Sequence, residues 1–258
     1  MENLIDFTVS DRIGYIILNR PEKRNALNAE MIKQLTNKFS EAEEREDVKM
    51  IVLKARGEVF SAGADLDYLR KLQQNSSEEN LEDSANLKNL FKTIYNITKP
   101  VIAQIEGHAI AGGCGLVSVC DIVFAVPEAQ FGYTEVKLGF IPALVSVFLI
   151  RKLGEGRTKE LLLSGELISA ETASAYGLIN FIVKRFSIDD TVKEYALKLA
   201  KTTSADSVKR TKQLLQLIQN INLDEVLEEA VQANTEARKS DDFKRGVAAF
   251  LNKEKLTW

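Results

Sequence analysis

Apolar and polar positions follow two different periods along the first third of the chain. Residues 13–18 and 50–53 are short, β-branched apolar runs, which predicts buried strands. Between these runs, apolar residues recur at spacings of three and four, which predicts an amphipathic helix with Asn28 as its N-cap. The apolar residues of this helix are Met31, Ile32, Leu35, Phe39 and Ala42. A strand, a helix and a strand in this order predict a parallel pair of strands.

The middle of the chain repeats this alternation. Residues 101–105 and 122–126 are further apolar runs that predict buried strands, with the glycine-rich residues 107–115 between them. The polar residues 73–80 predict a mobile surface segment that could close over a ligand. A helix through Leu87, Leu90, Phe91 and Ile94 follows it.

The strand pattern stops after residues 178–183, and the rest of the chain predicts helices. They cover residues 192–200, 208–218 and 223–237, and the last has an apolar stripe of Val226, Leu227, Ala230 and Val231. This tail could cap the core or pack against another subunit. The fold class is therefore α/β with a helical C-terminal part, and we divide the chain into residues 1–190 and 191–258.

Composition and charge exclude several classes of partner. The 258 residues include 34 basic and 37 acidic side chains. The basic residues do not cluster into a block, so we expect no nucleic-acid partner. Residues 209–212, Lys-Arg-Thr-Lys, predict a solvated helix face. The apolar residues 140–150 are too few for a membrane helix, which needs ~20 residues. The N-terminus lacks the basic and apolar segments of a signal peptide, so we expect no membrane partner.

Cys114, Cys120 and the single histidine, His108, cannot supply the four ligands of a structural zinc site, and we expect no metal. Two thiols in an apolar neighbourhood predict buried cysteines and a reducing, cytoplasmic location.

Two small-residue turns are the first candidates for chemistry. Residues 111–115, Ala-Gly-Gly-Cys-Gly, follow a predicted strand and lead into a short helix, where backbone N–H groups can meet a negative charge. Residues 60–66, Phe-Ser-Ala-Gly-Ala-Asp-Leu, also join a strand to a helix. Two such turns can aim two N–H donors at one oxygen. The spacing of a phosphate loop is absent, and the alternative is a pair of tight turns without a ligand.

Glu135 is the candidate acid or base, because it stands in a mostly apolar stretch, residues 131–142. It is either buried with a raised pKa, as a general acid/base requires, or exposed on a turn, which periodicity alone favours. His108 could also be a base, but its position favours a histidine whose hydrogen bonds are satisfied at a strand end. Cys114 lacks a partner base, and the chain has no Gly-x-Ser-x-Gly setting for a serine nucleophile.

Five ordered motifs resemble those of the crotonase (enoyl-CoA hydratase/isomerase) superfamily. They are residues 19–28, 60–66, 107–113, 120–122 and 131–142. The resemblance extends to Trp258. It implies a ββα spiral core over residues 1–190, which binds acyl-CoA and carries the catalytic residues. It also implies a helical trimerisation region over residues 191–258. It also implies homotrimers that can pair into hexamers.

The resemblance also implies a site. The thioester oxygen of an acyl-CoA would be held by the N–H groups of Ala64 and Gly112, with Glu135 as the catalytic acid/base. Coenzyme A is part of the substrate, so no separate cofactor is expected. The implied substrate-binding residues are Arg24, Ala26, Ala62, Asp65, Leu66, Gly113, Gly115, Phe250 and Lys253. Of these, Phe250 and Lys253 would reach the CoA of a neighbouring subunit.

One departure from the family pattern concerns the number of carboxylates. Typical hydratases carry two glutamates twenty residues apart; here the second matches Glu135 and the first falls on Gly115. Either Glu135 holds the water and shuttles its proton, or the reaction is not a simple hydration. The alternatives are a double-bond isomerase, a decarboxylase of a glutaconyl thioester, or a non-catalytic acyl-CoA binder.

A second departure favours one substrate. Residues 142–146 are Pro-Ala-Leu-Val-Ser where common hydratases have Pro-Gly-Ala-Gly-Gly. The combined pattern of residues 115–116, Gly-Leu, and 135–139, Glu-Val-Lys-Leu-Gly, is similar to the methylglutaconyl-CoA hydratase group of leucine degradation. The substrate of that group has a second, free carboxylate. A glycine at 115 removes a negative charge that would repel this carboxylate, and Arg70 and Lys71 are candidates to bind it.

Overall fold

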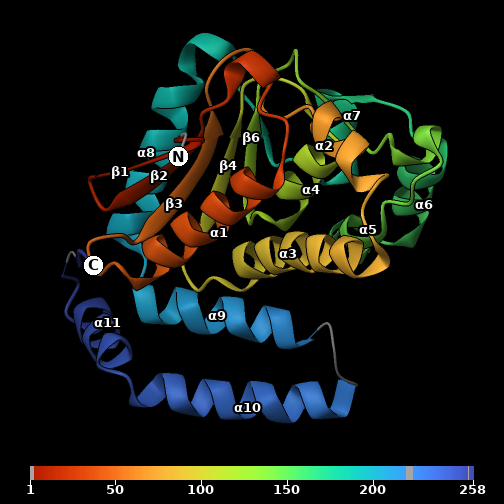
Figure 1. Cartoon of the computed structure of the whole chain (residues 1–258). Coiled ribbons are helices and arrows are strands. Elements are labelled where there is room, and N and C mark those ends of the chain that lie inside the picture. The colour runs from red at the N-terminus through yellow and green to blue at the C-terminus, as the bar shows by residue number, and fades with distance from the viewer. Residues whose placement is uncertain (1–2, 219–222, 255) are drawn as a thin grey trace.

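The computed structural model describes residues 3–218, 223–254 and 256–258. Within these residues the main sheet has six strands, in the order β1-β2-β3-β4-β6-β9 (Figure 1). The strands are β1 (Ile5–Ser10), β2 (Ile13–Leu18), β3 (Met50–Ala55), β4 (Val101–Ile105), β6 (Ile122–Ala125) and β9 (Phe181–Ile182). β1 pairs with β2 antiparallel, and every other neighbouring pair is parallel. The predicted parallel pair of β2 and β3 is therefore confirmed.

A smaller sheet stands beside the main one and carries the segments that matter for chemistry. It contains β5 (Ala109–Ile110), β7 (Gln130–Gly132) and β8 (Ile168–Ser169). β5 pairs parallel to β7, with Ile110 opposite Gly132, and β7 pairs antiparallel to β8. This register places the segment after β5 next to the segment after β7.

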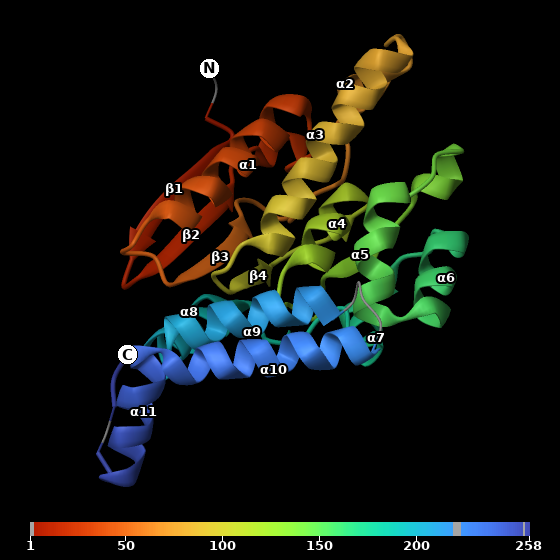
Figure 2. The same ribbon diagram turned by 90° about the horizontal axis from the view of Figure 1, so that it is seen from below.

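Helix α1 (Ala29–Glu44) forms as its periodicity predicts. The Asn28 side chain accepts a hydrogen bond from the N–H of Met31, and all five predicted apolar residues are buried. α1 packs on β1 and β2, whereas α8 (Ile188–Thr202) packs on β4 and β6. The sheet lies between these two helices (Figure 2), so the core is a helix, sheet and helix sandwich.

The other helices of the core follow the chain around the small sheet. They are α2 (Leu66–Leu72), α3 (Ser77–Asn96), α4 (Gly112–Val119), α5 (Ala143–Leu153), α6 (Glu155–Ser164) and α7 (Ala170–Tyr176). Short 3-10 helices are η1 (Pro21–Lys23), η2 (Glu135–Leu138) and η3 (Arg185–Ser187). The predicted surface segment over residues 73–80 lies at the surface, and its second half is helical. A capping box of Ser76 and Glu79 starts α3 at Ser77.

The C-terminal helices extend from the core as a separate layer (Figures 1 and 2). They are α9 (Ala205–Ile218), α10 (Leu223–Lys239) and α11 (Asp241–Leu251). The prediction of a fully solvated face at residues 209–212 was wrong for Lys212, whose side chain is 12% exposed. Its ammonium donates to Asp121 Oδ2 at 2.6 Å and to Lys99 O at 3.2 Å, which docks α9 on the core. Across the described residues, no helix has the length and apolar character to span a membrane.

Candidate active site

The first small-residue turn, residues 60–66, joins β3 to α2 and is held by Leu27. The N–H of Leu27 donates to Gly63 O at 2.6 Å, and the N–H of Asp65 donates to Leu27 O at 2.9 Å. In a parallel bridge of this kind, the residue between the two bonded groups turns its own N–H away from the partner strand. Ala64 is that residue. Its N–H has no protein acceptor within the described chain.

The second turn, residues 111–115, begins α4 at Gly112. Ala111 precedes the helix with φ 49° and ψ −121°. Its N–H donates to Gly132 O at 2.7 Å, and its C=O accepts from the N–H of Gly115 at 2.9 Å. The N–H of Gly112 belongs to the first helical turn, where no intrahelical acceptor exists. It has no other protein acceptor among the described residues.

The two turns touch at positions that have no side chain. A Cβ on Gly113 would lie 2.6 Å from the Cβ of Ser61, and a Cβ on Gly63 would lie 2.9 Å from the Cβ of Ala111. Both separations are shorter than an ordinary carbon–carbon contact, so each position requires glycine. The two free N–H groups therefore sit on backbones in direct contact, as a pair of donors to one oxygen requires.

Asn25 organises the loop in front of the first turn, a role that the sequence analysis missed. It is fully buried, and its Nδ2 donates to Arg56 O and Val59 O, each at 2.8 Å. Its Oδ1 accepts from the N–H of Arg20 at 2.8 Å, and its C=O accepts from Ser61 Oγ at 2.8 Å. The backbone of Asn25 has φ 51°, a conformation that asparagine tolerates better than most residues. The only signal in the sequence was its place within the 19–28 motif.

Glu135 begins η2, shortly after β7, and its carboxylate is partly enclosed. The Oε2 atom is buried and has no hydrogen-bond partner among the described residues. Burial raises the pKa of the Glu135 carboxyl above its ordinary value. The hydroxyl of Tyr133, two residues before Glu135, donates to Cys114 O at 3.3 Å, which joins this segment to α4. The periodicity of the sequence favoured an exposed glutamate, and the structure corrects this to a half-buried one.

Gly115 faces a space between α3 and α5 that is already filled. A Cβ at this position would lie 2.7 Å from Val145 Cγ1 and 2.8 Å from Phe91 Cζ. Phe91 and Val145 are both buried, and Phe148 packs edge-on against Phe91. The position that matches the first hydratase glutamate is therefore closed by apolar packing. The sequence alone indicates only a missing charge at this position.

Three of the predicted CoA contacts gather beside the first turn. The N–H of Ala62 donates to Arg24 O at 3.0 Å, and Ala26 O accepts from Arg20 Nη1 at 3.1 Å. Arg24 is exposed, Ala62 is half-buried and Ala26 is buried. The structure thus brings these residues together, and their contacts with CoA stay a prediction.

Asp65 and Leu66 lie at the start of α2. The Asp65 carboxylate accepts from the N–H groups of Asp67 and Tyr68 and pairs with Arg20 Nη1 at 2.7 Å. Asp65 therefore caps α2 and fixes the preceding turn to the Arg20 loop. Leu66 is 74% exposed beside it, as a ligand contact could be. The predicted binding roles of both residues remain predictions.

Lys253 and Phe250 are not near these turns in the same chain. Helix α11 lies at the lower left of Figure 1, away from α2 at the upper right and from α4 in the middle of the molecule. Lys253 is exposed after the end of this helix, and the side chain of Phe250 lies outside the described part of the chain. Their predicted contact with a neighbouring subunit stays a prediction.

The surroundings of His108 and the two cysteines indicate structural and not catalytic roles. His108 Nδ1 accepts from the N–H of Gln130 at 3.1 Å. Burial raises the pKa of the Cys114 and Cys120 thiols to about 12, which suppresses the thiolate a nucleophile needs. Within the described ranges, no group of His, Cys, Asp and Glu is arranged to hold a metal ion.

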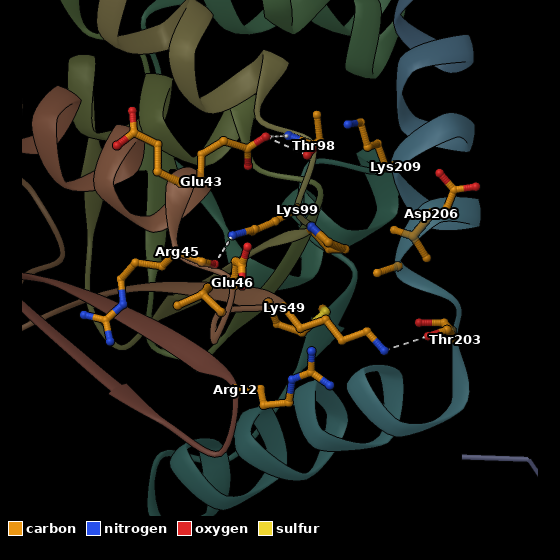
Figure 3. Close-up of a pocket in the computed structure, with 16 residues that line it drawn as sticks. Arg12, Glu43, Arg45, Glu46, Lys49, Thr98, Lys99, Thr203, Asp206 and Lys209 are labelled. Atoms are coloured by element: carbon orange, nitrogen blue, oxygen red, sulfur yellow. Dashed lines mark hydrogen bonds between the residues drawn. The ribbon is translucent and has the colours of Figure 1, made fainter. Parts of the chain in front are cut away.

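A cavity of about 430 Å³ lies at the amino ends of β3 and β4 (Figure 3), and none of its lining residues belongs to the two turns. Both basic and acidic side chains line it. Lys49 Nζ donates to Thr203 O at 2.9 Å, and Lys99 Nζ donates to Arg45 O at 2.6 Å. Backbone carbonyl groups therefore engage both of these ammonium groups.

Residues 8–258 match the enoyl-CoA hydratase/isomerase family, and the chain belongs to this family. It is 40% identical over 241 residues to a Thermus thermophilus protein with the provisional name enoyl-CoA hydratase, covering 93% of this chain and 95% of that one. It is 32% identical over 246 residues to the 2,3-dehydroadipyl-CoA hydratase of Escherichia coli, covering 94% and 93%. The enoyl-CoA hydratase structure of Mycobacterium smegmatis superposes with a TM-score of 0.93 at 30% identity, covering 100% and 99%. The expected α/β crotonase fold is confirmed.

Proposed function

We propose that the chain hydrates an enoyl-CoA whose acyl group carries a second, free carboxylate, and that 3-methylglutaconyl-CoA of leucine degradation is its substrate. The observation that carries this proposal is the buried, unpartnered Oε2 of Glu135, in a segment that Tyr133 joins to the helix beginning with the free N–H of Gly112. Apart from the identity of the acyl group, the chain is an enoyl-CoA hydratase, a hydro-lyase acting on an unsaturated acyl-CoA.

In the proposed mechanism, the thioester oxygen accepts from the N–H groups of Ala64 and Gly112. Glu135 takes a proton from water as the water oxygen bonds to Cβ, and the electron pair of the double bond moves through Cα to the thioester oxygen. Each N–H donor is typically worth ~3 to 4 kcal/mol at this enolate stage. Glu135 then returns the proton to Cα, so water adds to one face of the double bond. Gly113 supports the site by letting α4 approach Ser61 closely.

The substrate class rests on the wall around Gly115. Phe91 and Val145 close this wall, so no second carboxylate faces the reacting carbons there. Two unit charges ~4 Å apart would repel by ~4 kcal/mol at an effective dielectric of 20, so the absence of that charge favours an anionic acyl end. The Escherichia coli relative is named for an adipyl substrate, whose acyl end is also a carboxylate. Arg70 and Lys71 are exposed on α2 and remain the candidates to bind it, although Arg70 also pairs with Asp67 at 3.0 Å.

The test compares turnover of crotonyl-CoA, 3-methylglutaconyl-CoA and 2,3-dehydroadipyl-CoA, followed by loss of the conjugated-thioester absorbance with products identified by mass. We expect addition of one water and the highest kcat/KM with 3-methylglutaconyl-CoA. Loss of CO₂ or a shifted double bond would instead support a decarboxylase or an isomerase. Tight binding without turnover would support a non-catalytic binder.

A pair of variants separates charge from shape at position 115. Gly115→Glu and Gly115→Gln are both made together with Val145→Ala, which removes the methyl group closest to the new side chain. If charge decides the preference, the glutamate variant loses activity on the two dicarboxylic substrates relative to the glutamine variant, and both treat crotonyl-CoA alike. An equal preference in the two variants would contradict the electrostatic argument.

We further propose that the chain works in the cytoplasm as a homotrimer or a dimer of trimers. Residues 1–190 would bind acyl-CoA and catalyse, and residues 191–258 would assemble the subunits. Exposed apolar side chains on the C-terminal helices support the assembly, and two buried cysteines without a disulfide support the location.

A further inference from the structure

Ala111, which begins the second turn, has a backbone conformation that its side chain disfavours. Its φ is 49°, in the region where the Cβ of an L-residue crowds its own backbone. The described residues with positive φ other than glycine are Asp11, Arg12, Arg24, Asn25, Lys253 and Ala111. Ala111 is the only one of this set without a polar side chain, so no side-chain hydrogen bond can offset the strain. Strain held in place by its surroundings is often part of a functional site.

This conformation determines where the next N–H points. The N–H of Ala111 is fixed by Gly132 O at 2.7 Å, and its C=O is fixed by the N–H of Gly115 at 2.9 Å. Between these two anchors the chain must leave strand β5 and enter helix α4 within one residue. The positive φ makes that turn, and it leaves the N–H of Gly112 without an acceptor in the described chain.

The methyl group of Ala111 also spaces the two turns. It stands against Gly63, where an added Cβ would lie only 2.9 Å from it. Gly63 is joined by its carbonyl group to the N–H of Ala64, and Ala111 is joined in the same way to Gly112. The methyl group therefore packs against Gly63, which precedes the donor Ala64. Ala111 itself precedes the other donor, Gly112.

We infer that Ala111 is a positioning residue for the oxyanion donors. Its strained φ aims the N–H of Gly112, and its methyl group sets the separation between that N–H and the N–H of Ala64. This inference rests on the proposed role of the two N–H groups. In this role Ala111 touches no substrate atom and acts only through the backbone groups beside it.

The test is Ala111→Gly, which removes both the strain and the spacer. Glycine adopts this φ without penalty, so Tm should stay the same or rise. With a looser donor pair, kcat should fall about 10-fold, a part of the 10²–10³ that complete loss of one donor typically costs. KM should change little, because the ground-state thioester uses the donors less than the enolate does.

The matched control is Arg12→Gly. Arg12 has φ 65° in the exposed turn between β1 and β2, so this variant also relieves a positive φ, but far from the site. Its Tm should respond as in Ala111→Gly, and its kcat should equal that of the unmodified enzyme. A loss of kcat in both variants would overturn the inference, because it would show that general loosening is responsible.

A binding measurement adds a readout that a purely structural role would not move. Acetoacetyl-CoA has a second carbonyl group and can bind as an enolate, whereas the saturated butyryl-CoA binds as an ordinary thioester. In Ala111→Gly, the affinity for acetoacetyl-CoA should fall about 10-fold while the affinity for butyryl-CoA stays within about twofold. Equal changes for the two ligands, or unchanged kcat, would overturn the role of Ala111.

Glu135→Gln measured in parallel distinguishes this failure from failure of the proposed function. If Glu135→Gln is inactive and Ala111→Gly retains full kcat, only the positioning role is wrong. If Glu135→Gln stays active, the proposed mechanism fails, and the acetoacetyl-CoA comparison still decides whether Ala111 positions the donors.

Discussion

At the scale of single residues, the site depends on one carboxylate whose surroundings disfavour its charge. Glu135 is half-buried, its Oε2 has no protein partner among the described residues, and burial raises the pKa of its carboxyl. A general base must be ionised to accept a proton from water. The free oxygen therefore has a use only when water and substrate are present.

This environment predicts the pH dependence of the reaction. Because the pKa of Glu135 is raised, kcat/KM should fall with decreasing pH at a higher pH than an ordinary glutamate would give. Glu135→Gln should remove this acidic limb and lower kcat by roughly two to four decades, with little change in KM. Steady-state pH profiles measure both effects. More than half of the activity remaining in the variant would contradict the role of Glu135.

The same raised pKa has a consequence for stability with the opposite sign. The folded state holds this proton more tightly than the unfolded state does, so the contribution of Glu135 to stability is lost as pH rises through the folded pKa. Glu135→Gln should therefore gain Tm over the unmodified protein above that pKa and gain less below it. Exposed Glu128, seven residues earlier, offers the control Glu128→Gln, which should show no such difference.

Single residues also mark the limit of what the sequence could predict about the site. Glu135, Ala64 and Gly112 could be proposed because their motifs and turns are local in the chain. The functions of Asn25 and Ala111 could not, since each depends on backbone groups that are distant in sequence, such as Val59 O and Gly132 O. The closure of Gly115 by Phe91 and Val145 was hidden for the same reason.

At the scale of elements, buried or half-buried lysines from other segments cap the carboxyl ends of three core helices. Lys49 Nζ donates to Ala200 O at the end of α8, and Lys99 Nζ donates to Ala42 O at the end of α1. Lys152 Nζ donates to Cys120 O at the end of α4 at 2.7 Å. A cation at the carboxyl end of a helix satisfies free carbonyl groups and complements the helix dipole. In α4 this places a cation opposite the end that carries the oxyanion donor.

We expect Lys152→Met to destabilise the protein by about 1 to 3 kcal/mol, the usual cost of leaving buried carbonyl groups without donors. Burial lowers the pKa of Lys152, so part of this loss is offset because a buried charge is also removed. Urea denaturation measures the difference. Lys159→Met, which removes an exposed lysine paired with Glu155 on α6, should change the free energy of unfolding by less than about 0.5 kcal/mol. Equal effects in the two variants would contradict the capping role.

Elements were predictable where one face of the pattern is buried. α1 and strands β2 to β4 matched their apolar periods, whereas β1, the short strands of the small sheet, α5 to α7 and α11 were not predicted. β1 ends in a tight turn at Asp11 and Arg12, both with positive φ, and this turn lacks the glycine that usually identifies a hairpin. The helices of the C-terminal layer have apolar stripes without a core to bury them, so their packing could not be inferred from the chain.

At the scale of the whole molecule, the C-terminal helices present apolar surface that this chain leaves uncovered. Leu215, Leu227 and Val231 are each more than half exposed. α9 has no buried residue within its described length, and it meets the core through polar contacts such as Lys212 to Asp121. An exposed apolar layer attached by polar contacts is typical of a surface that other subunits cover.

We therefore expect a mass of three or six times the 28.8 kDa of one chain in light scattering. Leu227→Asp with Val231→Asp places two charges one turn apart on α10 and should reduce the mass to that of a single chain. Glu229→Lys alters an exposed charge on the same helix and should leave the assembly intact. An unchanged mass in the double variant would exclude this face of α10 as the interface.

The dissociated variant would also test whether the active site is complete in one chain. If Lys253 of one subunit reaches the CoA of another, separated chains should lose affinity for acyl-CoA while Glu135 and the two turns keep their structure. Lys253→Ala in the intact assembly should then raise KM in the same direction with kcat unchanged. If instead the separated chains bind acyl-CoA as tightly as the assembly, the residues around the first turn suffice for CoA, and the C-terminal layer serves assembly alone.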